Sequence, residues 1–308
     1  MPEIIITEFM DDATVRSAFA GRDVLYDPAL VDRPEELLRA VREARALIVR
    51  NRTQVRGSLL EAAARLSVVG RLGVGLDNID VEACSKRRIT VIPATGANDD
   101  AVAEYVVTAV LMLQRGAWFA TARMIAGKWP RMDLIGREVA GRKLGLLGFG
   151  AIARAAAVRA RALGMAIAAY DPFVAAADPV WHGVERVTLD ELFRRSDAVS
   201  LHVPLTDATR NLVDARLLAL MQPHAVLVNA ARGGILDEAA LVEALRTRRL
   251  GGAALDVFSR EPVDVASGAA FDDLPNLILT PHIAGVTVES NLRVSQVIAA
   301  AVLRHLSA

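Results

Sequence analysis

Short apolar runs alternate with amphipathic helical patterns from the start of the chain. Runs rich in β-branched residues at 4–7, 46–50, 67–70 and 89–92 predict strands, and the spacing at 34–43 and 81–87 predicts helices. Strands that alternate with helices favour a parallel sheet. The pattern breaks at the proline, glycine and asparagine within 93–98, and a long helical pattern over 99–127 follows. We therefore place the first domain junction there.

A second and longer series of strands and helices begins at Lys143. Apolar runs at 143–147, 166–170, 198–201, 225–229, 252–255 and 277–279 predict six strands of a doubly wound parallel sheet. The last segment, 289–306, has helical spacing and no strand after it, so we expect it to pack on the first domain. The predicted fold is α/β with two domains. Residues 1–97 and 286–308 form one discontinuous domain, and 98–285 form the other.

Composition and charge narrow the classes of partner. The chain has 308 residues, and its 36 Lys and Arg balance its 36 Asp and Glu, so no net field attracts nucleic acid or an anionic membrane. The apolar stretch 105–113 is far short of the roughly 18 to 20 residues that a membrane-spanning helix needs. The amino terminus lacks a basic region, and Cys84 is the only cysteine. We expect a cytoplasmic protein with no nucleic-acid or membrane partner.

A glycine-rich turn predicts a dinucleotide site. Gly148, Gly150 and Ala153 follow an apolar strand and open a helix that begins with Ala151 and Ile152. The first glycine permits a tight turn, the second lets the backbone approach a pyrophosphate, and the small third residue allows close helix packing. A purely structural turn is the alternative explanation, because a glycine cluster alone is weak evidence.

An acidic residue at the end of the next strand strengthens this interpretation. Asp171 lies about twenty residues after the glycines, where a carboxylate accepts hydrogen bonds from the adenosine ribose and repels the 2′-phosphate of NADP. We therefore predict NAD as the cofactor. Asp171 before Pro172 is also typical of a turn, and this alternative stays open.

Three further strands end in polar residues, at the edge where open α/β sheets bind ligands. Arg232, Glu261 and His282 lie in these segments, so their side chains can converge. An arginine fork suits a carboxylate and a carbonyl, a histidine can give a proton to a developing alkoxide, and a glutamate can orient that histidine. Alternatively, each residue is a surface charge, a turn acid or a strand-capping histidine. The set predicts reduction of a 2-keto acid.

Several blocks together resemble one family. Residues 70–80, the glycine fingerprint, residues 202–205 and the three segments that carry Arg232, Glu261 and His282 resemble the D-2-hydroxyacid dehydrogenases, over nearly the whole chain. The resemblance implies two Rossmann-like domains, one for substrate and one for NAD, with the active site in the cleft between them. It also implies a homodimer formed through the NAD domain and a small-molecule 2-hydroxy or 2-keto acid as substrate.

The resemblance also assigns residues to the cofactor and the substrate. Its implied cofactor contacts, beyond the fingerprint and Asp171, are His202, Val203, Pro204, Thr209, Ala230, Ala231, Asp256, Ala284 and Gly285. The loop at Val74 and Gly75 resembles the one whose N–H groups hold the substrate carboxylate, although it also has the sequence of a simple turn. Ala153 departs from the common third glycine but keeps the small size. No metal ion is predicted.

The tail of the substrate is the least determined part. Arg50 and Arg52 lie two apart on a segment expected to be extended, so both side chains leave one face, and Arg71 ends a run expected to neighbour theirs. Such a cluster suggests a second anion on the substrate, and these blocks resemble the phosphoglycerate dehydrogenase branch and the sulfolactate dehydrogenases of the family. The alternatives are solvated arginines and a substrate with an uncharged tail, such as glycerate or lactate.

Two other functions remain open. Formate dehydrogenases share this fold, but their sequence pattern has a glutamine at the position that Glu261 occupies in this chain. An NAD-sensing binding protein, like the corepressors of the family, would use the same fold for partner recognition without significant turnover. The neutral chain gives no nucleic-acid footprint, which disfavours that second possibility.

Overall fold

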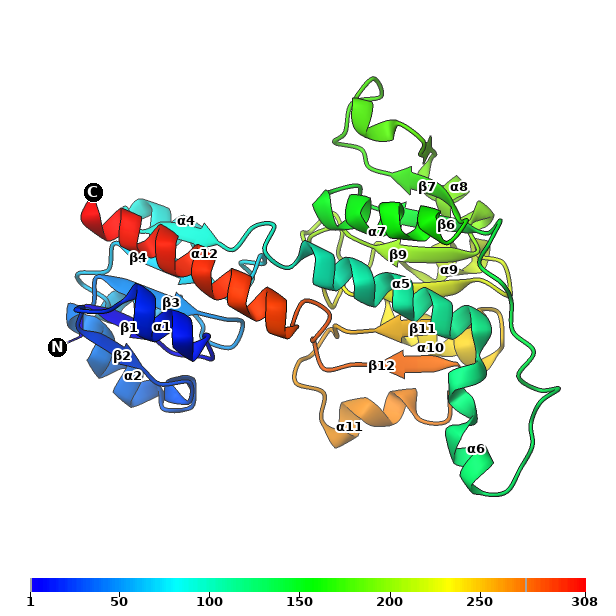
Figure 1. The fold of residues 1–308 in the computed structure, drawn as a ribbon, viewed down its shortest axis with the longest axis horizontal. Helices are drawn as coiled ribbons and strands as arrows, with labels where there is room; N and C mark the ends of the chain where they lie inside the picture. Colours follow the sequence, from blue (N-terminus) through cyan, green and yellow to red (C-terminus); the bar gives the residue numbers. More distant parts are fainter. Residues whose placement is uncertain (1, 275) are drawn as a thin grey trace. The chain divides into compact units, whose positions relative to one another are not determined.

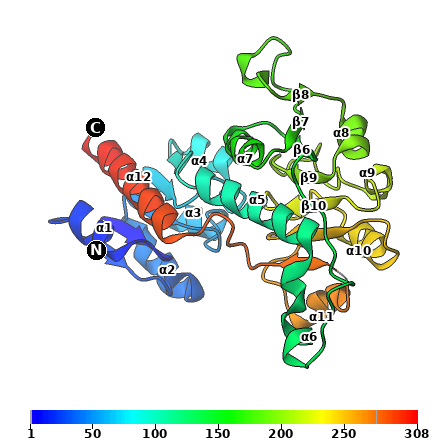
Figure 2. The ribbon, with the colours of Figure 1, turned by 45° about the vertical axis from the view of Figure 1, so that its right-hand side comes forward.

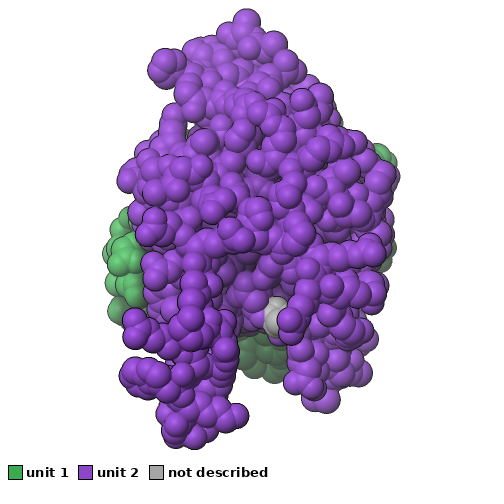
Figure 3. All heavy atoms as spheres, turned by 90° about the vertical axis from the view of Figure 1, so that its right-hand side faces the viewer, with its two compact units in different colours: residues 1–98, 286–308 green, residues 99–285 purple. Residues whose placement is uncertain are grey.

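The computed structural model describes residues 2–274 and 276–308, and the chain divides into two compact units. Unit 1 comprises Met1–Asn98 and Val286–Ala308, and unit 2 comprises Asp99–Gly285 (Figure 3). Each unit has a parallel sheet with helices, which confirms the predicted α/β class with two doubly wound sheets. Within the described residues, no helix is long and apolar enough to cross a membrane.

Unit 1 is built on a five-stranded sheet with the order β2-β1-β3-β4-β5. The strands are β1 (Ile4–Ile6), β2 (Val24–Tyr26), β3 (Ala46–Val49), β4 (Val68–Arg71) and β5 (Thr90–Pro93), and the helices are α1 (Asp12–Ala18), α2 (Pro34–Ala40), α3 (Ser58–Ala62), α4 (Val81–Lys86) and α12 (Val288–Ser307). The three central strands are buried along their whole length because apolar clusters cover both faces of the sheet. The terminal helix α12 packs on β4, where a Cβ at Gly70 would lie 2.7 Å from Ile298.

Unit 2 is built on a seven-stranded sheet with the order β12-β11-β10-β9-β6-β7-β8. The strands are β6 (Lys143–Leu147), β7 (Ala166–Tyr170), β8 (Glu185–Arg186), β9 (Ala198–Leu201), β10 (Val226–Asn229), β11 (Gly252–Leu255) and β12 (Leu277–Leu279); the helices are α5 (Asp99–Arg115), α6 (Thr121–Ile125), α7 (Ala151–Ala162), α8 (Leu189–Arg195), α9 (Ala215–Leu220), α10 (Glu238–Arg246) and α11 (Val265–Gly268). Figures 1 and 2 show α5 beside α7. The strand order reverses between β6 and β9, as in a doubly wound sheet.

The extent of one expected helix was wrong, a second expected helix is divided in two, and two edge strands were missed. The helix expected over 99–127 ends at Arg115, because Gly116 takes a left-handed conformation, and a short 3-10 turn and α6 follow. The helix expected over 34–43 is α2 followed by a 3-10 turn, Val41–Glu43. The edge strands β2 and β8 were not expected. They have two or three residues each and no fully buried one, so their hydrophobic signal is weak.

Candidate active site

The carboxyl ends of the strands of unit 2 carry most of the predicted site. All seven strands are parallel, so the loops that follow them emerge at one edge of the sheet. The glycine turn follows β6, Asp171 follows β7, His202 follows β9, Arg232 follows β10, Asp256 and Glu261 follow β11, and His282 follows β12. The chain therefore brings the predicted cofactor and catalytic residues of this unit to a single edge.

The two glycines of the turn are needed for different reasons. Gly148 has φ +89°, and a Cβ there would lie 2.9 Å from the His202 carbonyl, so the turn itself requires glycine. A Cβ at Gly150 would have no atom within 4 Å, so the fold alone does not demand glycine at that position. Gly150 is the N-cap of α7, whose first N–H groups have no side-chain cap from any described residue. An open, uncapped helix start fits the pyrophosphate of a dinucleotide.

Asp171 ties this turn to the next strand. Its carboxylate accepts hydrogen bonds from the N–H of Phe149 at 2.8 Å and from the N–H of Phe173 at 2.9 Å. A carboxylate has about four acceptor sites, so capacity remains for ribose hydroxyls. Ala153 is fully buried in the core of the unit, as the small third position of the fingerprint requires.

The loop after β9 has a neutral histidine and an internally bonded threonine. His202 Nε2 is buried with no hydrogen-bond partner among the described residues, and this burial lowers the pKa of His202 to about 4. Thr209 Oγ1 donates to the Pro204 carbonyl at 2.6 Å and so shapes the loop. Val203 closes on the glycine turn, 3.0 Å from where a Gly148 Cβ would lie.

A residue that the sequence analysis did not single out builds the loop after β10. Buried Asn229 donates from Nδ2 to the Arg232 carbonyl at 3.0 Å and accepts the Ala231 N–H at 3.1 Å. These bonds fold residues 229–232 into a tight turn, and the Arg232 guanidinium also bonds the Ala231 carbonyl. The available signal was a polar side chain at the last position of an otherwise apolar strand. Ala230 and Ala231 lie half-buried in the turn.

Glu261 and His282 form a hydrogen-bonded pair. Glu261 Oε2 lies 2.7 Å from His282 Nδ1, and Glu261 Oε1 accepts the Phe258 N–H at 2.9 Å. Burial raises the pKa of Glu261, but the bonds from His282 and Phe258 and the charges of His282 and Arg232 outweigh it, so the pKa is lowered overall. Arg232 and His282 therefore both act electrostatically on Glu261.

Asp256 supports the segment that carries His282. Its buried carboxylate accepts hydrogen bonds from Thr280 Oγ1 at 2.6 Å and from the N–H groups of Ile283 and Ala284, both at 2.8 Å. Its carbonyl accepts the His282 N–H at 2.8 Å, and His282 takes φ +54°. Asp256 was predicted as a cofactor contact, whereas the hydrogen bonds given above join it to other residues of the chain. Its carboxylate fixes the 280–284 turn, including Ala284 just before Gly285.

In unit 1 the predicted carboxylate loop has free donors. The N–H groups of Val74 and Gly75 donate no hydrogen bond to another described residue, and Val74 is exposed. Two N–H groups side by side on an exposed loop suit an anion. Gly73, just before them, has φ +152° and leaves room for the Arg71 side chain, which would otherwise meet a Cβ at 1.7 Å.

The expected arrangement of Arg50 and Arg52 was wrong. Strand β3 ends at Val49 and residues 51–53 bend, so the two side chains do not leave one face of an extended segment. Arg52 pairs with Asp32, whereas Arg50 bonds Asn291 of α12 and lies over the Phe9 ring at 5.6 Å.

The bend at 51–53 has a cause that the sequence analysis missed. The buried Glu8 carboxylate accepts the N–H groups of Arg50 at 2.9 Å and Thr53 at 3.0 Å, which holds the loop. The expected neighbour relation is confirmed, since β4, which ends at Arg71, pairs with β3.

Comparisons with known proteins agree on one family. Residues 107–284 match the family model described as "D-isomer specific 2-hydroxyacid dehydrogenase, NAD binding domain". The chain is 53% identical over 296 residues to an (S)-sulfolactate dehydrogenase of Chromohalobacter salexigens. The matched region covers 96% of this chain and 95% of that protein. It is 37% identical over 300 residues to a D-3-phosphoglycerate dehydrogenase of Synechocystis, covering 96% of this chain but only 52% of that one.

Solved structures agree with these relatives. The TT0316 protein of Thermus thermophilus superposes with a TM-score of 0.90 at 32% identity, covering 99% of this chain and 96% of that one. A glyoxylate reductase of Paecilomyes thermophila superposes with a TM-score of 0.85 at 26% sequence identity, covering 98% of this chain and 95% of that one. None of the relatives named here is a corepressor, so the binding-protein alternative gains no support. The chain therefore belongs to the D-isomer specific 2-hydroxyacid dehydrogenases and is an NAD-dependent oxidoreductase that acts on a CH–OH group.

Proposed function

We propose that Arg232, Glu261 and His282 catalyse the NADH-dependent reduction of a 2-keto acid to a D-2-hydroxy acid, and the reverse oxidation with NAD. The observation that carries this proposal is the 2.7 Å bond between Glu261 and His282 Nδ1, at the same sheet edge as Arg232. His282 Nε2 has no hydrogen-bond partner in the described part of the chain, which leaves it available to a substrate oxygen.

Each residue has a distinct role in the proposed reaction. When bound, NADH would supply the hydride for the keto carbon. Arg232 binds the carboxylate and polarises the carbonyl, and protonated His282 gives its Nε2 proton to the oxygen as negative charge develops there. The Glu261 carboxylate orients the ring and stabilises its charged form before the transfer. In the direction of oxidation, His282 takes the proton back from the hydroxyl.

The proposed cofactor and substrate contacts are built from backbone and short side chains. The pyrophosphate would lie at the start of α7, against Gly148, Gly150, Ala151 and Ile152. The Asp171 carboxylate would accept hydrogen bonds from the ribose hydroxyls. The loops after β9, β10, β11 and β12 complete the NAD site through His202, Val203, Pro204, Thr209, Ala230, Ala231, Asp256, Ala284 and Gly285. The N–H groups of Val74 and Gly75 hold the substrate carboxylate.

Replacing His282 tests the catalytic assignment. We expect His282→Ala to lower kcat roughly 10²- to 10⁴-fold, the usual contribution of a positioned acid or base, while the dissociation constant for NADH changes little. Steady-state rates with NADH and fluorescence titration of NADH measure the two effects. His182→Ala, at an exposed position, serves as the matched control. Turnover close to that of the unmodified enzyme in His282→Ala would remove His282 from the mechanism.

The proposed substrate carries a second anion, a sulfonate or a phosphate on C3. The 53% identity to an (S)-sulfolactate dehydrogenase supports a sulfonate first. Arg50 also supports it, since its Nε is buried without a partner among the described residues. Arg52 is held by an exposed ion pair with Asp32, and such pairs contribute little, so a substrate can displace Asp32.

Assays of charged and uncharged keto acids test this proposal. We expect sulfopyruvate and 3-phosphohydroxypyruvate to exceed pyruvate and hydroxypyruvate in kcat/KM, because a guanidinium binds tetrahedral oxyanions well. Arg50→Ala and Arg52→Ala should each lose at least about tenfold in kcat/KM for the charged substrates and little for pyruvate. Arg65→Ala, another exposed arginine in an ion pair, is the control. Equal losses on both kinds of substrate, or a preference for hydroxypyruvate or pyruvate, would favour an uncharged tail.

We also propose that the protein works in the cytoplasm as a homodimer through unit 2. A segment of this unit that we call the apolar arm, residues 117–136, supports the dimer. Its large exposed side chains are Trp118, Phe119, Met124, Ile125, Trp129, Met132 and Ile135. Apolar side chains gathered in this way mark an interaction surface.

A further inference from the structure

Two loops of unit 2 lie against each other at the proposed catalytic edge. The turn after β10 carries Arg232, and the loop after β11 carries Glu261. They approach so closely at Gly233 that a Cβ there would lie 1.8 Å from the Phe258 carbonyl oxygen and 2.7 Å from the Ser259 nitrogen. No side chain fits between the loops at this point. The position of residues 258–261 therefore depends on the backbone that starts at Gly233 and leads into α10.

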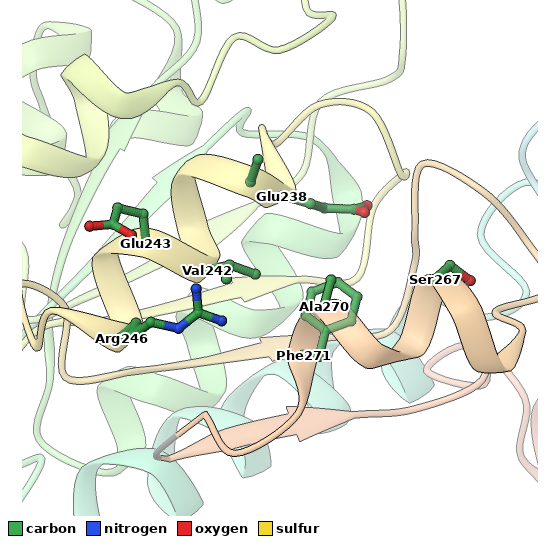
Figure 4. Close-up of a pocket in the computed structure, with 8 residues that line it drawn as sticks. Glu238, Val242, Glu243, Arg246, Ser267, Ala270 and Phe271 are labelled. Atoms are coloured by element: carbon green, nitrogen blue, oxygen red, sulfur yellow. The ribbon is translucent and has the colours of Figure 1, made fainter.

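The next element along the chain holds the second loop directly. Glu238, the first residue of α10, accepts the Ser259 N–H with Oε1 at 2.6 Å. The neighbouring Phe258 N–H goes to Glu261 Oε1 at 2.9 Å, and Glu261 Oε2 bonds His282. The adjacent N–H groups of Phe258 and Ser259 are thus held by two different carboxylates, those of Glu261 and Glu238. Figure 4 shows Glu238 at the start of α10, on the wall of an open groove between α10 and α11.

We propose that Glu238 is a positioning residue for the proton donor: by holding the Ser259 N–H, it sets where Glu261 meets His282. Without this bond, the Phe258 N–H, the contact at Gly233, the packing of Phe258 on Phe271 and the Arg260–Asp264 ion pair still hold the loop. The segment at Ser259 loses its own anchor, so Glu261 is held less firmly against the ring. The proposal rests on the roles proposed above for Glu261 and His282. Glu238 is not among the substrate and cofactor contacts proposed above.

A purely structural role for Glu238 makes a different prediction. An acidic residue in the first turn of a helix stabilises that helix through its dipole, which affects stability but not the charge of a distant ring. A positioning role instead changes the protonation of His282, because the facing carboxylate favours the charged ring. The charged groups around this network are Glu243 and Arg246 on α10 and, on the loops and beside the His282 turn, Arg232, Asp256, Arg260, Glu261 and Asp264. None of them is altered by replacing Glu238.

Two substitutions separate these roles. Glu238→Asp keeps the charge, and with it the favourable interaction with the helix dipole, but is one methylene too short to reach Ser259. Glu238→Gln keeps the reach with a weaker neutral acceptor. Glu243→Gln is the matched control, since Glu243 lies on the same helix and lines the same groove but accepts no hydrogen bond from the loop in the described structure. Thermal unfolding of each variant reports any loss of stability separately.

The titration of the His282 ring is the primary measurement. The chain has five histidines, so ring signals of histidine-labelled protein can be resolved by NMR, and the His282 signal is the one absent from His282→Gln. We expect its midpoint to be lower in Glu238→Asp than in the unmodified protein, with a smaller difference in Glu238→Gln and none in Glu243→Gln. The pH profile of kcat/KM is measured with whichever keto acid of the panel above reacts fastest. The pH at which kcat/KM for its reduction declines should move in the same direction.

The outcomes distinguish this inference from the function on which it rests. An unchanged midpoint in Glu238→Asp overturns the positioning role, whether or not the variant is less stable. Glu261→Gln is the reference. If Glu261→Gln lowers the midpoint and Glu238→Asp does not, only the role of Glu238 is wrong. If Glu261→Gln leaves the midpoint unchanged as well, the proposed pairing of Glu261 with His282 is wrong.

Discussion

Two histidines at strand ends have opposite surroundings. His282 has a carboxylate 2.7 Å from Nδ1, which favours the protonated ring. His202 has a buried Nε2 with no partner in the described structure, and burial lowers the pKa of its ring to about 4. Within one unit, the His282 ring faces a carboxylate, whereas burial keeps the His202 ring neutral.

The neutral state of His202 predicts how stability depends on pH. The unfolded chain binds a proton at His202 near pH 6.5, but the folded chain does so only near pH 4, so stability is complete above 6.5 and is lost as pH falls toward 4. Between pH 7 and pH 5 this residue should remove about 2 kcal/mol from the free energy of unfolding. Urea unfolding of the protein and of His202→Gln at both pH values measures the difference.

His224 provides the control for this prediction. Its Nε2 is already paired with Asp197 at 2.7 Å, so His224→Gln should leave the slope that His202 causes unchanged. The same pH dependence in His202→Gln as in the unmodified protein would contradict a buried neutral ring at this position.

At the scale of elements, the start of α7 has a glycine, Gly150, that the fold itself does not require. Gly150 has an ordinary φ of −75°, and a Cβ there meets nothing within 4 Å. We expect Gly150→Ala to change the free energy of unfolding by less than about 1 kcal/mol, because the lower conformational entropy of the unfolded alanine chain offsets a poorer N-cap. NADH affinity should fall at least about tenfold, because the methyl group occupies the approach of the pyrophosphate.

Calorimetric titration of NADH and thermal unfolding measure these two effects. Gly148→Ala is the contrasting variant, since its φ of +89° and the contact with the His202 carbonyl make the substitution costly for folding itself. Unchanged NADH affinity in a stable Gly150→Ala protein would rule out a pyrophosphate at this helix start.

At the scale of the whole molecule, the apolar arm predicts the oligomeric state. Ile125 and Trp129 are 83% and 77% exposed, and a second copy of the chain would bury them. The double variant Ile125→Lys with Trp129→Lys should therefore sediment at the mass of one chain, 33.0 kDa, while the unmodified protein sediments at about twice that mass. Val265→Lys, 94% exposed on α11, is the control and should not dissociate. A dimer that persists in the double variant would exclude the arm as the interface.

The family and the fold class follow from short-range patterns. Central strands such as β6 and β9 were predicted with their observed bounds, because buried parallel strands are continuous apolar runs between turns. The glycine turn and the placement of Arg232, Glu261 and His282 after successive strands also followed, since parallel strands bring their ends to one edge. These features depend on neighbours in sequence and on one general rule of sheet topology.

Partners far apart in sequence were decided by the tertiary structure alone. Glu8 bends the loop at residues 50–53 from more than forty positions away, and it thereby sends Arg50 and Arg52 to different partners. Glu238 reaches Ser259 across 21 positions, because the pairing of β10 with β11 and the close approach at Gly233 bring the two segments together. A carboxylate can accept an N–H from any segment that packing places near it, and the order of residues along the chain does not specify which segment that is.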